Sequence, residues 1–160
     1  MKAVFNTSPL VFLSKLGYLP LLRAIFQNVL VPKAVFRELA VKKDDVYRDV
    51  ETLIGESFIV IEEVKDVVTL TLTNLHTGEA EAITLAKRLN CWVALDDSKA
   101  RGIAMREGLE VIGTLGLLKV MMRNGLVEEK PEDLFLKLTL HRFRMKKEVF
   151  LAILMDKGKR

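Results

Sequence analysis

The chain has 160 residues, half of them hydrophobic, with a single cysteine and a formal net charge of +4. This length suits one compact domain that buries about 68 to 70% of its unfolded surface without disulfides. The mild basic excess suits a polyanionic partner but does not require one. The lone Cys91 excludes an internal disulfide and favours a cytoplasmic location. No uncharged run reaches the ~18 to 20 residues of a bilayer span, so we expect no membrane association.

The first half of the chain alternates short apolar runs with helical patterns. Lys2–Phe5 is predicted to be a strand, and it is followed by a helix that Ser8 caps and Gly17 ends. Residues 68–73 alternate with period two, which fits either an extended edge segment or a loop. The other elements predicted here are a helix over 20–27 that Pro20 starts, a strand over 29–31, helices over 32–39 and 43–54, and a strand over 58–61.

The second half continues the alternation and then becomes entirely helical. Its predicted elements are a helix over 78–89, a strand over 92–95, a helix over 98–107 ended by Gly108, a strand over 110–112, and helices over 113–123, 131–139 and 145–156. Continuous apolar strands between helices predict an α/β fold, a three-layer α/β/α sandwich with five parallel strands. We expect one domain over 1–160, with its core at about 3–125 and a C-terminal helical extension at about 126–160.

Several polar residues are predicted to meet at one edge of this sheet. Ligands of open α/β sheets bind outside the carboxyl ends of the strands, where loops and helix N-termini are free for function. The residues at that edge are Asn6, Thr7 and Ser8 after the first strand, Glu38 in the helix after the second, Glu79 and Glu81 in the helix before the fourth, Asp96 and Asp97 after the fourth, and Thr114 after the fifth.

The acids among these residues point to a divalent metal. Mg²⁺ or Mn²⁺ prefers hard oxygen ligands, often one or two carboxylates with several waters retained. Such an ion can activate water to attack a phosphodiester. Four carboxylates would permit one ion or two, and without a cation they would repel one another. The sequence therefore predicts a metal site formed by Glu38, Glu79, Asp96 and Asp97.

Five short motifs in a fixed order resemble a known family. They are Asn-Thr-Ser-Pro-Leu at 6–10, Val-Pro-x-x-Val-x-x-Glu-Leu at 31–39, Gly-Glu-Ala-Glu-Ala-Ile at 78–83, Leu-Asp-Asp-x-x-Ala-Arg at 95–101, and Val-Ile-Gly-Thr-Leu-Gly at 111–116. Over about residues 3–125 the chain resembles the PIN-like proteins, specifically a prokaryotic branch long classed as a domain of unknown function. The resemblance implies an α/β/α sandwich and a metal-dependent ribonuclease, often the toxin of a toxin-antitoxin pair. It also implies RNA as substrate, an antitoxin protein as partner, and a homodimer.

The family's functional residues fall on particular positions of this chain. By position, the resemblance assigns the helical glutamate to Glu38, the acid of the middle helix to Glu79, and the acid after the fourth strand to Asp97 with Asp96 beside it. The family's first acid, normally an aspartate, is Asn6 here, and an amide oxygen brings no charge. Two interpretations stay open: an endoribonuclease that uses Mg²⁺ or Mn²⁺, or a catalytically impaired nucleic-acid-binding or regulatory module.

Ordinary structural roles also fit several of these residues. Asp97 fits the N-cap of the following helix, and an acid such as Glu79 is favourable in any first helical turn. Other residues at this edge could orient a metal-bound water or touch phosphate. We expect such supporting roles for Thr7, Ser8, Glu81, Arg101 and Thr114.

A basic run that contains one aromatic residue occupies positions 141–147, His-Arg-Phe-Arg-Met-Lys-Lys. This composition can bind a nucleic-acid backbone and stack a base. A solvated helix junction with Phe143 in the core is the favoured explanation. The nucleic-acid-binding candidates are Arg142, Arg144, Lys146 and Lys147.

Two other kinds of site fit the sequence poorly. Adjacent aspartates occur in response-regulator receiver folds, but there the pair follows the first strand, whereas Asp96 and Asp97 follow the fourth predicted strand. His76 and His141 are too isolated to suggest a zinc site.

Overall fold

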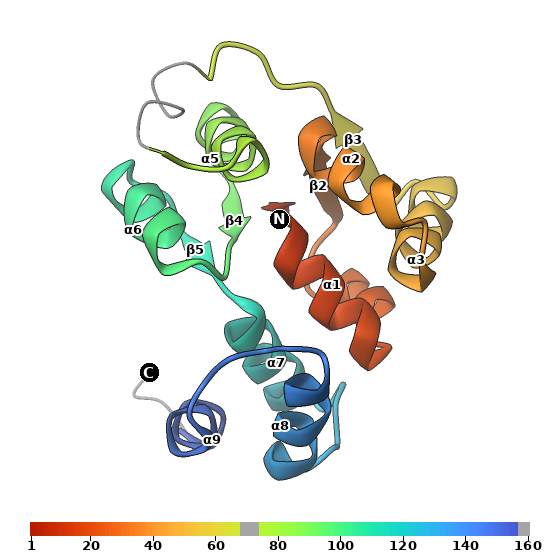
Figure 1. Cartoon of the computed structure of the whole chain (residues 1–160), viewed down its shortest axis with the longest axis vertical. Coiled ribbons are helices and arrows are strands. Elements are labelled where there is room, and N and C mark those ends of the chain that lie inside the picture. The colour runs from red at the N-terminus through yellow and green to blue at the C-terminus, as the bar shows by residue number, and fades with distance from the viewer. Residues whose placement is uncertain (68–73, 157–160) are drawn as a thin grey trace.

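The computed structural model describes residues 1–67 and 74–156. Five parallel strands form one sheet in the order β3-β2-β1-β4-β5 (Figure 1). The five-stranded parallel sheet is therefore confirmed, while the segment 68–73 lies outside the described residues. The strands are β1 (Lys2–Phe5), β2 (Asn28–Pro32), β3 (Ile59–Glu62), β4 (Trp92–Ala94) and β5 (Val111–Ile112).

The strand order places β1 at the centre of the sheet. The chain adds β2 and β3 on one side of β1, then crosses over and adds β4 and β5 on the other side. Phe5 is paired with Ala94, so the carboxyl ends of β1 and β4 lie next to each other. A reversal of this kind opens a crevice at the carboxyl ends of the strands, where ligands of such sheets bind.

The helices follow the predicted ones closely. The stretch predicted as a helix over 20–27 forms a shorter 3₁₀ helix, in which the i, i+3 pair Leu19 and Leu22 is buried. Within the described residues, no helix is long and apolar enough to cross a bilayer. The helices are α1 (Thr7–Leu16), η1 (Leu19–Ala24), α2 (Lys33–Lys42), α3 (Asp45–Gly55), α5 (Thr77–Leu89), α6 (Ser98–Arg106), α7 (Thr114–Arg123), α8 (Pro131–Leu140) and α9 (Lys147–Met155).

The start of α1 differs from the prediction that Ser8 caps the helix. The helix begins at Thr7, and Asn6 occupies the N-cap position without a side-chain cap hydrogen bond. The reason is tertiary: the backbone N–H of Asn6 still donates to the carbonyl of Ala94, at 3.1 Å, so the strand runs directly into the helix. The Asn6 amide is therefore not used to cap α1.

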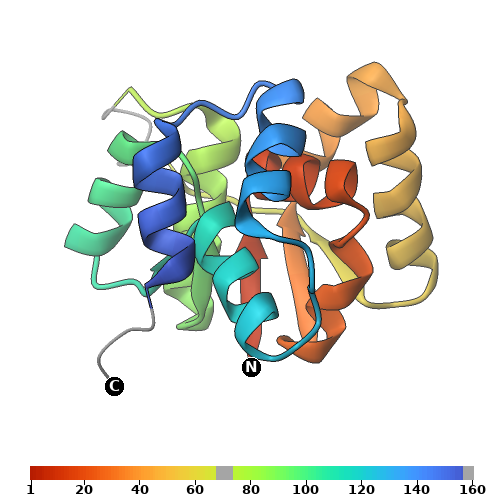
Figure 2. The ribbon, with the colours of Figure 1, turned by 90° about the horizontal axis from the view of Figure 1, so that it is seen from below.

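Successive residues of β1 divide the core into two layers. Ala3 and Phe5 pack on one face of the sheet with residues of α1, α3, α7, α8 and α9. Val4 packs on the other face with residues of α5 and α6. Figure 2 shows α1, α7 and the C-terminal helices on the same side of the strands. This arrangement confirms the three-layer α/β/α sandwich.

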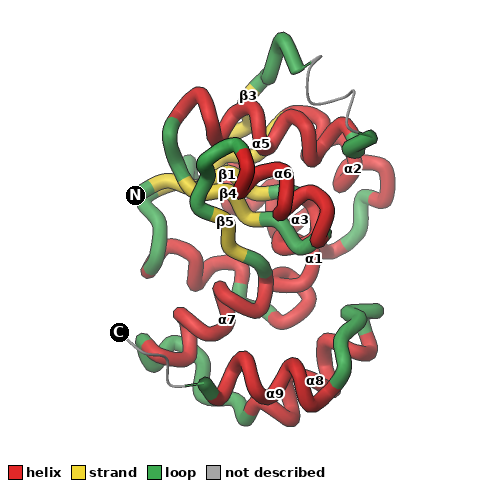
Figure 3. Tube along the Cα trace, turned by 90° about the vertical axis from the view of Figure 1, so that its left-hand side faces the viewer, coloured by secondary structure: helices red, strands yellow, loops and turns green. Residues whose placement is uncertain are grey.

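The C-terminal helices belong to the first of these layers. α8 and α9 contact each other, and α9 also contacts α7, which lies between them and the strands (Figure 3). Leu134 and Phe150 are fully buried in the same cluster as Phe5. Polar contacts add to this packing, because Tyr18 O–H and Lys137 both donate to Glu129.

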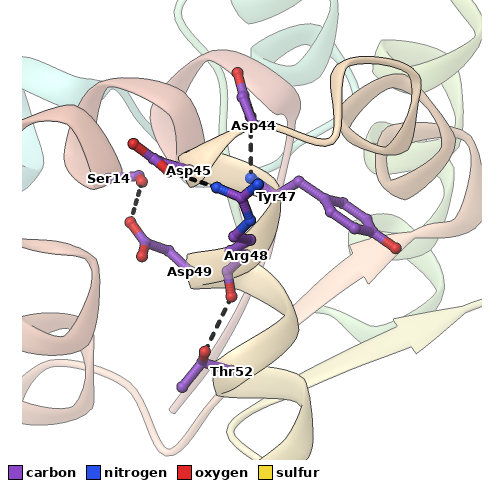
Figure 4. Close-up of polar contacts among 7 residues, drawn as sticks. All are labelled: Ser14, Asp44, Asp45, Tyr47, Arg48, Asp49 and Thr52. Carbon is purple, nitrogen blue, oxygen red and sulfur yellow. Dashed lines mark hydrogen bonds and ion pairs between the residues drawn. The ribbon is translucent and has the colours of Figure 1, made fainter.

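A separate set of polar contacts orders α3 (Figure 4). Ser14 Oγ of α1 donates a 2.5 Å hydrogen bond to Asp49 Oδ2 of α3. At the N-cap of α3, Asp44 Oδ1 accepts from the backbone N–H of Tyr47 at 3.2 Å. Asp44 thereby satisfies one of the otherwise unpaired N–H groups of the first turn.

Candidate functional site

One pocket at the carboxyl end of the sheet gathers oxygen-bearing side chains from three parts of the chain. It has a volume of about 320 Å³. We call it the acid pocket. It is lined by Asn6 after β1, Thr7 and Ser8 in the first turn of α1, Glu38 of α2, and His76 and Glu79 at the start of α5.

Glu38 is held in place from two sides. Thr7 Oγ1 donates a 2.6 Å hydrogen bond to Glu38 Oε2. The other oxygen, Oε1, lies against Gly78: a Cβ built on this glycine would be 2.7 Å from Glu38 Oε1 and 3.3 Å from Asn6 Oδ1. Because the first separation is shorter than carbon and oxygen tolerate, a side chain at position 78 would require Glu38 Oε1 to shift. Gly78 thus leaves room for two oxygen atoms of the acid pocket.

Glu79 lies beside them at the N-terminus of α5. Its Oε2 accepts a 3.1 Å hydrogen bond from the backbone N–H of His76. The residue is 8% exposed and Asn6 is 7% exposed, so both are buried polar groups. The N-terminal end of a helix favours a carboxylate, which helps to explain why Glu79 is tolerated at this burial.

The donor set of the acid pocket suits a small, hard cation. It offers the carboxylates of Glu38 and Glu79, the amide oxygen of Asn6, and the nearby hydroxyls of Thr7 and Ser8. Mg²⁺ is commonly held by one or two carboxylates together with waters and substrate phosphates. Across residues 1–67 and 74–156, no three Asp, Glu, His or Cys side chains are arranged to hold a metal by themselves. A cation here would therefore complete its coordination with Asn6, water and phosphate.

Asp96 has different surroundings. Its Oδ1 accepts from the backbone N–H of Thr114 and its Oδ2 from Thr114 Oγ1, both at 2.7 Å. Burial raises the pKa of the Asp96 carboxyl, an effect opposed by these two hydrogen bonds and by the charge of Arg101. Arg101 itself donates to the carbonyl of Leu95 at 3.0 Å. We call Asp96, Arg101 and Thr114 the Asp96 cluster, and it fastens the start of α7 to the end of β4.

Asp97 and Glu81 also have structural partners. Asp97 is the N-cap of α6, and its Oδ2 accepts from the backbone N–H of Ala100 at 2.9 Å. Glu81 is 8% exposed and accepts a long hydrogen bond of 3.4 Å from the backbone N–H of Ala34. The structure therefore brings Glu38 and Glu79 together and gives Asp96 and Asp97 other contacts. A metal site shared by all four carboxylates stays a prediction.

The basic candidates at the end of α8 divide between two places. Arg142 lines a groove that adjoins the acid pocket. Arg144 lines a separate pocket of about 500 Å³ together with Asp96 and Arg101. Phe143 is half-buried and packs edge to face on Phe12, with ring centroids 5.0 Å apart. The packing of Phe143 on Phe12 therefore agrees with the explanation that assigns Phe143 to the core. Lys146 and Lys147 are exposed.

The sequence did not predict a role for His76, which lines the acid pocket, or for Gly78, which lies against it. Gly78 is part of a motif, and His76 is too isolated for a zinc site. A glycine within the first turn of a helix, directly before an acid, is the signal that could have identified Gly78, because alanine is the better helix former there. For His76 no comparable signal exists, because it lines the acid pocket only through its position at the N-cap of α5.

Comparison with known proteins gives a family match over nearly the whole chain. A family model described as DUF3368, a PIN domain, matches residues 2–159. Among solved structures, a PilT N-terminus domain protein from the hyperthermophilic archaeon Sulfolobus solfataricus P2 is similar, with 17% sequence identity and a TM-score of 0.48 over 81% of this chain and 98% of that chain. No curated protein matches the chain. On the strength of the family match, this chain belongs to the PIN-domain family.

Proposed function

We propose that this protein is a metal-dependent endoribonuclease that hydrolyses RNA phosphodiester bonds with Mg²⁺ or Mn²⁺. PIN domains generally have a nuclease fold and typically use divalent metals. The observation that supports this activity here is the acid pocket, where Glu38 Oε1 and Asn6 Oδ1 both approach Gly78. Glu79 lines the same pocket.

Four residues of the acid pocket have distinct parts in this proposal. Glu38 and Glu79 hold the cation, Asn6 adds a neutral oxygen, and Thr7 keeps Glu38 in position. When bound, the metal supplies positive charge at the phosphate and lowers the pKa of its water. The first turn of α1 has no side-chain cap, so the backbone N–H groups of Thr7 and Ser8 can donate hydrogen bonds to a phosphate oxygen.

Cleavage of labelled single-stranded RNAs in Mn²⁺ tests the proposal. Glu38→Gln keeps the size of the side chain and removes its charge. We expect a loss of about a hundredfold or more, the scale for removing one group that acts at the reacting centre. Glu132→Gln is the matched control, because Glu132, like Glu38, is an exposed glutamate of a helix, and it does not line the pocket. The proposal fails if a broad RNA panel stays intact with wild-type protein.

The second candidate function is a catalytically impaired nucleic-acid-binding or regulatory module. Asn6 favours it, because this position supplies no negative charge to hold a cation. Asn6→Asp separates the two functions. A gain of nuclease activity would identify an impaired site, whereas robust activity in the wild type that the substitution leaves unchanged would show that asparagine suffices.

A finer part of the proposal concerns the biological setting. The resemblance favours a cytoplasmic toxin that forms a homodimer and pairs with an antitoxin protein. Induced expression of the chain in a bacterial host should then arrest growth, and Glu38→Gln should relieve the arrest. Continued growth with active wild-type nuclease would reject the toxin role while leaving the chemistry in place.

A further inference from the structure

A second hollow adjoins the acid pocket, and its charges are mainly positive. It has a volume of about 370 Å³ and shares Thr7 and Glu38 with the acid pocket. We call it the basic groove. It lies between α1 and α2 and is completed by the end of α8. Its charged lining residues are Lys15, Glu38, Lys42, Asp44 and Arg142.

The three cations of the basic groove outnumber its two acids. In the described part of the chain, none of Lys15, Lys42 and Arg142 takes part in an ion pair. The two acids of the groove accept hydrogen bonds from neutral donors, Asp44 from the backbone of Tyr47 and Glu38 from Thr7, so they keep their negative charges. With three exposed cations against these two acids, the lining carries a net positive charge.

Among the three cations, Arg142 gives the strongest indication of a functional role, because its backbone conformation is unfavourable. Lysines near helix C-termini, such as Lys15 and Lys42, are favourable whatever a protein does. Arg142 instead lies just beyond the end of α8 with φ of 68°, in the left-handed region that glycine usually occupies after a helix. Glycine would adopt this conformation at lower cost. An arginine kept in a costly conformation beside a functional pocket suggests that its side chain is used.

The position of the basic groove suggests what the three cations contact. A nucleic-acid strand with one phosphate in the acid pocket would pass Thr7 and Glu38 and bring its neighbouring phosphates into the groove. Cationic side chains bind such phosphates without regard to base sequence. Leu140, which is 81% exposed at the groove, adds an apolar surface for a sugar or base.

We propose that the basic groove binds the phosphate backbone of single-stranded RNA on one side of the scissile bond. The substrate must then extend beyond the cleaved bond on that side to bind well. This inference rests on the proposed function only for the location of the scissile phosphate. RNA binding by the groove is measurable without cleavage.

Fluorescence anisotropy of a labelled single-stranded RNA in EDTA tests the groove directly. Lys15→Ala, Lys42→Ala and Arg142→Ala should each raise Kd and reduce the slope of log Kd against log salt by about 0.7, the value for one lost phosphate contact on a single strand. Lys130→Ala, at the opposite end of α8, is the matched control and should change neither quantity.

Arg142→Gly separates binding from folding. Glycine removes the side chain and suits the left-handed backbone, so the variant should weaken RNA binding while Tm stays equal or rises. The inference is overturned if the three groove variants lose no more affinity than Lys130→Ala. It is also overturned if the groove variants bind RNA normally but lose affinity for an acidic peptide.

Cleavage kinetics then distinguish this inference from the proposed nuclease. If both hold, the groove variants raise KM for long RNAs, leave kcat unchanged, and have little effect on a dinucleotide that cannot reach the groove. RNA binding that depends on the groove in a protein that never cleaves RNA would refute the nuclease and keep the groove. Nuclease activity in the wild type, together with groove variants that bind RNA as the wild type does, would refute the groove and keep the nuclease.

Discussion

The acid pocket and the Asp96 cluster place carboxylates at the same edge of the sheet but treat them differently. In the acid pocket, Glu38 Oε2 and Glu79 Oε2 each accept one hydrogen bond and face a hollow. In the Asp96 cluster, both oxygens of Asp96 accept from Thr114. Location at the strand ends is therefore a poor guide to function by itself. Among these carboxylates, we expect the two that line the hollow, Glu38 and Glu79, to bind a cation.

The largest effect on RNA cleavage should come from neutralising one acid in each of these two regions and comparing the losses. Glu79→Gln should lower RNA cleavage about a hundredfold or more, because it removes charge from the acid pocket. Asp96→Asn should cost less than about tenfold, because Thr114 can still bond to an amide. Steady-state cleavage in Mn²⁺ measures both. A larger loss from Asp96→Asn would identify Asp96 as the ligand.

A smaller effect is expected when the space for the acid-pocket oxygens is filled. Gly78→Ala should push Glu38 Oε1 away and weaken Mn²⁺ binding about 10- to 100-fold, as changes to groups that position metal ligands do. Calorimetric titration with Mn²⁺ measures the affinity. Gly102→Ala is the matched control, because a Cβ at this other helical glycine meets nothing within 4 Å. Equal affinities in the two variants would contradict the role of Gly78.

In the Asp96 cluster, the expected effect is on stability and not on metal binding. Thr114→Val removes one donor from the partly buried Asp96 carboxylate and should lower the free energy of unfolding by about 1 to 3 kcal/mol. The pKa of Asp96 is already raised and should rise further. A raised acid pKa favours folding at low pH and loses that benefit as pH rises through it, so the deficit should be larger at pH 7 than at pH 3. Urea unfolding at both pH values provides the measurement, and unchanged stability would contradict the structural role.

The smallest effect should come from Glu129, a carboxylate shared by Tyr18 and Lys137. The hydrogen bond from Lys137 and then that from Tyr18 lower the pKa of Glu129. A lowered acid pKa stabilises the fold above the unfolded value and loses this contribution as pH falls through the folded value. Glu129→Gln should therefore reduce the free energy of unfolding by about 1 kcal/mol or less at pH 7 and by less at pH 3. An equal deficit at both pH values would exclude an electrostatic origin.

Most of the fold could be predicted from the sequence because its signals are local. Apolar runs such as that of Val29–Val31 and the glycine at position 17 mark strands and helix ends directly. The start of α1 could not be predicted, because it depends on the hydrogen bond from Asn6 to Ala94, which joins parts of the chain that are far apart in the sequence. Local capping preferences alone favoured Ser8.

For the candidate site, the sequence predicted the edge of the sheet at which the acids lie but not their contacts. Chain order placed Glu38, Glu79 and Asp96 at one edge, but it could not show which partner each acid meets. Asp96 reaches Thr114 because β4 pairs with β5 at Ala94 and Ile112, which brings the start of α7 alongside. The basic groove was equally hidden, since its cations come from three separate elements.

The close approach at Gly78 also constrains how this protein can vary. A bulkier residue at this position is compatible only with a Glu38 side chain that has moved or been replaced. Positions 6, 38 and 78 should therefore change together among natural relatives. A relative that lacks the glutamate at 38 is under no such constraint and is free to take alanine, the better helix former, at 78. If the acid pocket binds a cation as proposed, glycine at position 78 should accompany glutamate at position 38 in the relatives that bind one.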